Sequence, residues 1–217
     1  MSPEEIEALD WEKQGGLLPA VVQDEHNGRV LMLGYMNRDA IQATLDTGQV
    51  TFWSRSKERL WTKGETSGNA LVFVRFDRDC DRDTLLVTAR PNGPTCHLGR
   101  PSCFAQAPGN FLADLDTLIR ERELDRPPGS YTANLFESGT KGIAQKVGEE
   151  GVETALAAVA EDEEALLGEA ADLIYHLIVL LRSRGLSFQD AVKVLQERHA
   201  AQEAAAGVSP DGPLQMA

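Results

Sequence analysis

The sequence has no apolar run long enough to cross a membrane, since none approaches the roughly 18–20 residues that a membrane span needs. It also lacks the layout of a signal peptide, because residues 1–11 are acidic and place no basic group before an apolar stretch. Both absences favour a cytoplasmic protein.

Basic residues are scarce, with 21 Lys and Arg against 34 Asp and Glu and a net charge of −13. The imbalance is greatest in residues 113–217, which hold nine basic and 19 acidic residues. Because nucleic-acid backbones are bound by basic surfaces, this balance argues against a nucleic-acid partner. A small phosphorylated substrate is compatible with the acidic composition if metal ions and a local basic loop neutralise its phosphates. The composition therefore favours an enzyme.

Cysteine is also rare, with only Cys80, Cys96 and Cys103 in the chain. An odd number of cysteines, in a sequence without a secretory signal, argues against a set of structural disulfides. Any one of them alone would be interpreted as a small buried hydrophobe. Three thiols within 24 positions instead indicate a metal site.

The first half of the chain is β-rich in pattern. Residues 21–23 and 30–33 flank Asn27-Gly28, a pair typical of a type I′ hairpin turn. Asn37 can cap a helix over residues 38–46, which Gly48 would end. Further β-branched and aromatic runs predict strands over residues 50–53, 70–76 and 84–89.

Near residue 110 the pattern becomes helical. Helical spacing over residues 112–124 places Leu112, Leu115, Leu118 and Ile119 on one face, and the Pro-Pro-Gly at 127–129 ends that helix. Two long helices are predicted over residues 142–160 and 163–184, and a last one after Ser187, which pairs with Asp190 as in a capping box. The tail beyond about residue 205 is predicted to be disordered. The fold class is an α+β, β-rich N-terminal domain (1–112) followed by an all-α C-terminal domain (113–217).

The segment Asp79-Cys80-Asp81-Arg82-Asp83 is the strongest single signal in the first half. In an extended strand the three aspartates would share one face and Cys80 would lie on the other. Carboxylates suit Mg²⁺ and a thiolate suits Zn²⁺, so one strand could serve two metals. The alternative is a solvated acidic turn.

A second thiol segment runs from Cys96 to Cys103. Together with Cys80 it offers three thiolates, and three protein ligands with one open position are the arrangement of a catalytic zinc. A structural zinc would more often have four ligands in closely spaced pairs. His97 could be a fourth ligand, a general base or merely structural.

Residues 53–69 form a basic segment in an acidic chain, rich in glycine and hydroxyl side chains that can surround a phosphate. Trp53 or Trp61 could stack on a base, although at least one of them is expected in the core. The substrate-binding candidates in this segment are Trp53, Arg55, Ser56, Lys57, Lys63, Gly64, Ser67 and Asn69.

The stretches W-S-R-S-K-E-R-L-W-T-K-G-E-T-S-G-N, D-C-D-R-D and C-H-L-G-R-P-S-C-F resemble the phosphoribosyl-AMP cyclohydrolase family over about residues 13–108. The resemblance implies zinc on Cys80, Cys96 and Cys103, shared between the subunits of a homodimer, and magnesium on Asp79, Asp81 and Asp83. It also implies that zinc-bound hydroxide attacks C6 of the N1-substituted adenine and opens the ring. That attack is similar to the chemistry of zinc nucleobase deaminases.

Carboxylates also recur at helical spacing in the second half. Glu149, Glu150 and Glu153 lie on one predicted helix, and Glu169 and Asp172 lie on the next. Such clusters usually belong to a solvated face. Asp172, however, stands within an apolar run, where a carboxylate is costly without a partner or a metal.

The pattern E-E-x₂-E … E-x₂-D is similar to the all-α nucleotide pyrophosphohydrolases, and residues 139–150 and 169–176 extend the match to phosphoribosyl-ATP pyrophosphohydrolase over roughly residues 113–200. The resemblance implies that Mg²⁺ on the five carboxylates binds the triphosphate of the nucleotide. Glu149, Glu150 or Glu153 would orient the attacking water, and Lys141 and Lys146 would stabilise phosphate charge. The family commonly has a second lysine where this chain has Gly142.

The two resemblances name consecutive steps of histidine biosynthesis, because the product of the second half is the substrate of the first. Two other interpretations remain open on the sequence alone. One is a general nucleoside triphosphate pyrophosphohydrolase carrying a zinc domain of other purpose. The other is a non-catalytic, zinc-stabilised dimerisation module with an acidic interaction surface.

Overall fold

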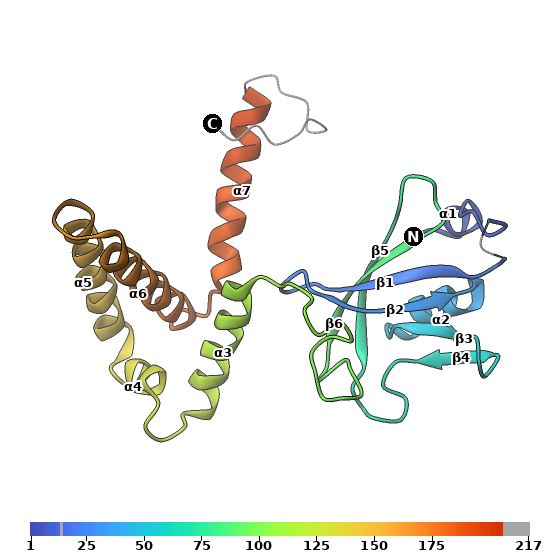
Figure 1. Ribbon diagram of the computed structural model, residues 1–217, viewed down its shortest axis with the longest axis horizontal. Coiled ribbons are helices and arrows are strands. Elements are labelled where there is room, and N and C mark those ends of the chain that lie inside the picture. The colour runs from blue at the N-terminus through green and yellow to red at the C-terminus, as the bar shows by residue number, and fades with distance from the viewer. Residues whose placement is uncertain (14, 206–217) are drawn as a thin grey trace. The chain divides into compact units, whose positions relative to one another are not determined.

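The computed structural model describes residues 1–13 and 15–205, and it divides into two compact units, Met1–Phe111 and a second that begins at Leu112. The first is built on β-strands and the second is all-helical, which confirms the predicted fold class (Figure 1). The first unit contains α1 (Pro3–Glu7), β1 (Leu18–Asp24), β2 (Val30–Met36), α2 (Arg38–Thr47), β3 (Thr51–Ser54), β4 (Arg59–Thr62), β5 (Leu71–Arg78) and β6 (Leu85–Pro91).

Four of these strands form one sheet in the order β2-β1-β6-β5, and β3 and β4 form a separate two-stranded sheet. β1 is antiparallel to β2 and parallel to β6. Every second residue of β1 is buried, beginning at Leu18, as expected for a strand with one face on the core. α2 lies against β2 and β3 and closes that core with Ala40 and Ile41 (Figure 1).

The predicted hairpin between β1 and β2 is confirmed, but the prediction of a two-residue turn is wrong. The connection runs over residues 25–29, with Gly28 at φ 70°. The Gly28 N–H donates to the Asp24 carbonyl, and the Asn27 side chain accepts from the Arg29 N–H. These local bonds stabilise a longer loop than Asn-Gly alone would suggest.

The α2 helix begins and ends as predicted. The Asn37 side chain accepts from the Ala40 N–H, and Gly48 closes the helix in the left-handed conformation at φ 67°. Only glycine adopts that conformation without steric cost.

Two segments of the first unit differ from the predictions. Residues 59–62, treated as part of a basic loop, form β4, where Trp61 stacks on Phe52 of β3 at 5.7 Å between ring centroids. The strand predicted to carry the three aspartates ends at Arg78, and residues 79–83 form a turn. There the Asp79 carboxylate accepts hydrogen bonds from the backbone N–H groups of Asp83 and Thr84. These bonds take the place of the backbone bonds that a continued strand would form.

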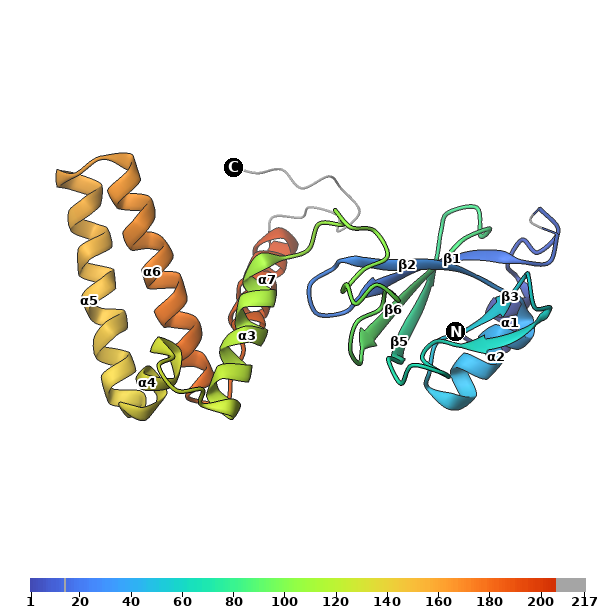
Figure 2. The same ribbon diagram turned by 60° about the horizontal axis from the view of Figure 1, so that its bottom comes forward.

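The second unit contains α3 (Phe111–Asp125), α4 (Tyr131–Glu137), α5 (Gly139–Ala160), α6 (Glu163–Arg182) and α7 (Phe188–Ala205). α5 and α6 lie side by side as a long helical pair (Figures 1 and 2). The core that they share with α3 and α4 is centred on Ile119, Ile143 and Ile178. Within the described residues, no helix is long and apolar enough to cross a membrane.

The predicted face of α3 is only partly right. Ile119 is buried, whereas Leu118 is exposed. The buried polar residue of this helix is Asp116, which forms a bidentate ion pair with Arg182 of α6.

The capping pair at the start of α7 is confirmed, since Ser187 and Asp190 exchange hydrogen bonds between side chains and backbone. Gly185, at φ 73°, follows the end of α6 in the left-handed conformation. The short helix α4 was not predicted, although Ser130 caps it. The disorder predicted beyond residue 205 falls outside the described residues.

Candidate active sites

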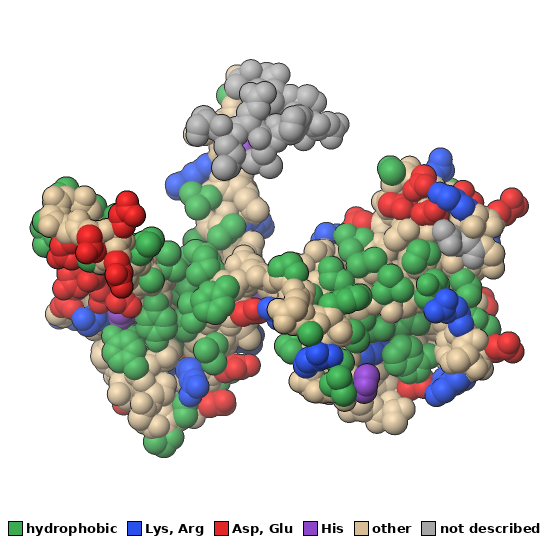
Figure 3. Space-filling model, in the orientation of Figure 1, with side chains coloured by type: hydrophobic (Ala, Val, Ile, Leu, Met, Phe, Trp, Pro, Cys, Tyr) green, Lys and Arg blue, Asp and Glu red, His purple; other side chains and the backbone are tan. Residues whose placement is uncertain are grey.

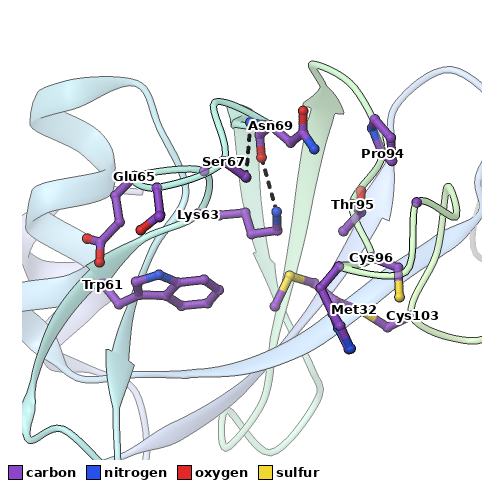
Figure 4. Close-up of a pocket in the computed structure, with 14 residues that line it drawn as sticks. Met32, Trp61, Lys63, Glu65, Ser67, Asn69, Pro94, Thr95, Cys96 and Cys103 are labelled. Carbon is purple, nitrogen blue, oxygen red and sulfur yellow. Dashed lines mark hydrogen bonds between the residues drawn. The ribbon is translucent and has the colours of Figure 1, made fainter.

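The first unit contains an open cavity of about 530 Å³ between the β4 end of the small sheet and the loop that holds Cys96 and Cys103. Figure 4 shows Trp61 and Lys63 entering it from one side, with the thiol loop facing them. Of the predicted substrate-binding residues, this cavity is lined by Lys63, Gly64, Ser67 and Asn69. His97 lines the same cavity.

The two thiols at this cavity differ in electrostatic environment. The Leu98 N–H lowers the pKa of Cys96, with further lowering from Arg100, whose Nη2 lies 3.9 Å from the sulfur. Burial raises the pKa of Cys103, and the neighbouring Cys96 adds to the shift. Each thiol is within hydrogen-bonding reach of the other, so the pair can offer two sulfur ligands to one cation.

Lys63 is the buried cation of this cavity. Its side chain is only 8% exposed, and Nζ donates to the Asn69 carbonyl at 3.0 Å (Figure 4). Desolvation lowers the pKa of Lys63, while the two thiols nearby act in the opposite direction. The bond to Asn69 fixes the position of the Lys63 ammonium group at the cavity.

The rest of the basic segment does not reach this cavity. Trp53, Arg55 and Ser56 line a different hollow on the β3–β4 hairpin, where the Arg55 guanidinium lies 3.8 Å from the centroid of the Tyr35 ring. Lys57 is exposed in the turn between the two strands. Trp61 lines both hollows. The single phosphate loop suggested by the sequence is thus divided between two surfaces.

The three aspartates do come together, in a turn rather than on a strand face. Asp79, Asp81 and Asp83 place one carboxylate oxygen each within 4.8 Å of one another. Lys13 reaches into this group, with Nζ 2.5 Å from Asp81 and 2.6 Å from Asp83. The hydrogen bond to Asp81 contributes most to the raised pKa of Lys13. The cluster therefore already accommodates one positive charge, a contact that the sequence pattern did not reveal.

Cys80 lies apart from the other two thiols. It is exposed, and within residues 1–13 and 15–205 no cysteine belongs to a group of three metal-ligating atoms within 4.8 Å of one another. The chain thus brings together two of the three predicted sulfur ligands.

A second carboxylate cluster lies between α5 and α6. Glu150, Glu169 and Asp172 place their oxygens within 4.8 Å of one another. Burial raises the pKa of Glu169, and the charges of Glu153 and Glu150 raise it further. Figure 3 shows acidic side chains gathered on this pair of helices. Repulsion of this kind is relieved by a bound cation.

The sequence predicted five carboxylates at one position, and three of the five form the group that the structure brings together. Glu149 pairs with Lys146 at 3.0 Å and lies outside the three-membered group, as does the exposed Glu153. The expected burial of Asp172 is wrong, because that side chain is exposed and Glu150 is the buried member. Because successive residues of a helix point in different directions, the apolar sequence around Asp172 does not bury its side chain.

Lys146 stands beside the cluster, 3.5 Å from Glu150. Lys141 is exposed in the first turn of α5. Two further residues at this cluster, His176 and Tyr131, were not assigned a role from the sequence. The buried His176 lies 3.6 Å from Glu150, and its ring contacts the hydroxyl of Tyr131 at 2.8 Å. The only sequence signal was the position of His176 four residues after Asp172.

Gly142, where the family resemblance led us to expect a second lysine, is closely packed against Ser138. A Cβ at this position would lie 2.5 Å from Ser138 Oγ and 2.8 Å from Ser138 Cβ. Ser138 is held there because its hydroxyl donates to the Leu135 carbonyl.

The β-rich unit with a thiol-lined cavity and the helical unit with a carboxylate cluster together define a two-domain hydrolase with separate candidate metal sites. Residues 32–105 match the phosphoribosyl-AMP cyclohydrolase family, and residues 112–199 match the phosphoribosyl-ATP pyrophosphohydrolase family. The chain belongs to the family of bifunctional histidine-biosynthesis enzymes that join these two domains.

Similar proteins support this assignment over most of the chain. The histidine biosynthesis bifunctional protein HisIE of Xanthomonas axonopodis pv. citri (strain 306) is 66% identical over 194 residues, which cover 89% of this chain and 94% of that protein. The protein of the same name from Yersinia pestis is 55% identical and covers 92% and 98%. The chain is thus a phosphoribosyl-AMP cyclohydrolase and a phosphoribosyl-ATP pyrophosphohydrolase, which decides against a non-catalytic zinc module.

Proposed function

We propose that residues 1–112 open the adenine ring of phosphoribosyl-AMP at a zinc centre built on Cys96 and Cys103. The observation that carries this proposal is the convergence of two thiols, a buried lysine and His97 on one cavity. The lowered pKa of Cys96 fits a thiolate ligand. Zinc bound there would supply a water molecule that loses its proton near neutral pH and can attack C6.

The side chains of the cavity have separate roles in this reaction. His97 accepts the proton of the attacking water as general base. Lys63, with Ser67 and Asn69 beside it, binds the phosphoribosyl phosphate. Arg55, Ser56, Lys57 and Trp53 lie on the adjoining hairpin and bind the more distant part of the substrate. Asp79, Asp81 and Asp83 bind magnesium through hard carboxylate oxygens, the ligands that this ion prefers.

We infer that the third sulfur ligand, Cys80, comes from a second copy of the chain in a homodimer. Its separation from Cys96 and Cys103 within one chain supports this arrangement. Exposed apolar side chains on α5 and α6 provide further surface for association, including Val152, Leu156, Val159 and Leu167.

Residues 113–217 carry out the preceding step, in which phosphoribosyl-ATP is hydrolysed to phosphoribosyl-AMP and pyrophosphate. Glu150, Glu169 and Asp172 hold magnesium, and Glu149 and Glu153 flank the cluster and orient water. Lys146 and Lys141 stabilise the phosphate charge. The clustering of three carboxylate oxygens beside a lysine supports this assignment. Magnesium bound there would polarise the phosphoryl oxygens of the triphosphate.

Subunit complementation tests the shared zinc centre. Cys80→Ala and Cys96→Ala should each abolish ring opening, while both retain release of pyrophosphate from phosphoribosyl-ATP. When equal amounts of the two variants exchange subunits, a mixed dimer should contain one intact centre, restoring about a quarter of the wild-type ring-opening activity. Mixing Cys96→Ala with Cys103→Ala is the matched control, because both changes damage the same half-site and no recovery should follow. Recovery in neither mixture would contradict the shared centre.

A further inference from the structure

The edge of the helical site beside Lys146 has a half-exposed aromatic ring that the hydrolysis step leaves unused. Tyr131, the first residue of α4, is 53% exposed, and its hydroxyl is held 2.8 Å from Nε2 of the buried His176. The opposite ring nitrogen, Nδ1, lies 2.8 Å from the backbone oxygen of Asp172. One histidine therefore connects the Tyr131 ring to a carboxylate-bearing turn of α6.

The hydrogen-bond directions follow from the partners. The Asp172 carbonyl can only accept, so Nδ1 of His176 is the donor in that contact, and the tautomer with its single proton on Nδ1 accepts at Nε2. The Tyr131 hydroxyl is then the donor to Nε2. Its oxygen lone pairs are left for a donor from outside, such as a ribose hydroxyl. The Tyr131 ring is stacked with the ring of Tyr175, at 6.2 Å between centroids and an interplanar angle of 25°.

The uneven distribution of charge around the carboxylate cluster would orient a bound nucleotide. Lys146 precedes Glu150 by four residues on α5, and His176 follows Asp172 by four residues on α6, so each lies about one helical turn along its helix from a member of the cluster. Toward the α5–α6 connection lie Glu153 and Glu161, whose negative charges add to the raised pKa of Glu169. A triphosphate at the cluster is repelled on that side and attracted on the side of Lys146, where Tyr131 follows.

We propose that Tyr131 is the platform on which the nucleoside part of phosphoribosyl-ATP stacks, and that His176 is the positioning residue that holds this ring in place. The inference rests on the proposed function, since it takes the carboxylate cluster as the triphosphate site. Stacking of a base on an aromatic ring needs the ring more than the hydroxyl.

Three variants, assayed with phosphoribosyl-ATP in the full-length protein, separate these contributions. Tyr131→Leu should raise KM about tenfold with little change in kcat, because it removes a stacking surface. Tyr131→Phe keeps the ring and should raise KM about threefold at most. His176→Asn can still donate to the Asp172 carbonyl but leaves the Tyr131 hydroxyl without its acceptor, so it should reproduce the effect of Tyr131→Phe.

Tyr175→Phe is the matched control, because it removes a hydroxyl bonded to Thr132 rather than to His176. It should leave KM unchanged. The same chain supplies a second control, since the KM for phosphoribosyl-AMP in ring opening should not change in any variant.

Two outcomes distinguish failure of this inference from failure of the proposed site. If Glu150→Gln abolishes hydrolysis of phosphoribosyl-ATP while Tyr131→Leu leaves KM unchanged, only the platform is wrong. If Glu150→Gln keeps wild-type hydrolysis, the carboxylate site itself is wrong. A loss of kcat with normal KM in Tyr131→Leu, Tyr131→Phe and His176→Asn would also overturn the platform.

Discussion

Lys13 Nζ lies 2.5 Å from Asp81 Oδ2 and 2.6 Å from Asp83 Oδ2, and so places a positive charge among the three aspartates of the first unit. A divalent cation bound by these carboxylates has to displace that ammonium. Lys13→Met should therefore increase the affinity of the cluster for Mg²⁺ or Mn²⁺ several-fold, as measured by calorimetric titration. Lys13→Arg keeps the charge and should stay near wild type. An unchanged affinity in Lys13→Met would show that the ammonium does not compete.

The ion pair between Asp116 and Arg182 should be essential to the stability of the helical unit. Asp116 is 1% exposed, so Asp116→Ala would leave the Arg182 guanidinium without its buried partner. We expect a loss of about 3–5 kcal/mol in the free energy of unfolding of this unit, measured by denaturant titration. Glu121→Ala, an exposed change on the same helix, should have little effect. A loss below about 1 kcal/mol in Asp116→Ala would contradict this role.

Gly151 offers a way to stabilise α5. An added Cβ would meet only Leu173 Cδ1 at 4.0 Å, so Gly151→Ala should raise the free energy of unfolding by about 0.5–1 kcal/mol. Gly142→Ala in the same helix is the contrasting variant, because its Cβ would collide with Ser138. Thermal unfolding of the two variants should therefore shift in different directions. Equal shifts would show that backbone propensity alone decides.

The carboxylate cluster of the helical unit should make stability dependent on pH and metal. Burial and neighbouring charges raise the pKa of Glu169 above its ordinary value of 4.5, so the folded chain binds this proton more tightly than the unfolded chain. Without metal, the contribution of Glu169 to the free energy of unfolding should be fully present below pH 4.5. It should be lost as pH rises through the raised pKa of Glu169. Thermal unfolding at several pH values measures the dependence.

The same cluster supplies the control for that measurement. Glu169→Gln should flatten the metal-free pH dependence and should reduce the increase in unfolding temperature that Mg²⁺ produces at neutral pH. If Glu169→Gln retains the full increase, Glu169 is not a ligand of this ion.

Much of the fold was predictable because it rests on local patterns. The Asn37 and Gly48 caps defined α2, and the exchange between Ser187 and Asp190 marked the start of α7. β4 was missed because charged residues surround Trp61, and only its pairing with Phe52 makes the segment a strand.

The candidate sites were predictable as residue types but not as geometry. The aspartates were expected to meet through strand alternation, whereas the bonds to the Asp79 carboxylate create a turn that brings them together. Burial of Glu150 rather than Asp172 depends on how α5 and α6 are rotated against each other. The contact of Tyr131 with His176 joins residues 45 positions apart and has no local signal.

The most direct test of the two-site account is to follow phosphoribosyl-ATP through the Cys96→Ala and Glu150→Gln variants, with zinc and magnesium present. Pyrophosphate release and the ultraviolet change on ring opening report the two steps separately. Cys96→Ala should release pyrophosphate and accumulate phosphoribosyl-AMP, whereas Glu150→Gln should leave phosphoribosyl-ATP intact but still open added phosphoribosyl-AMP. If either variant loses both steps while remaining folded, the assignment of one site to each unit is contradicted.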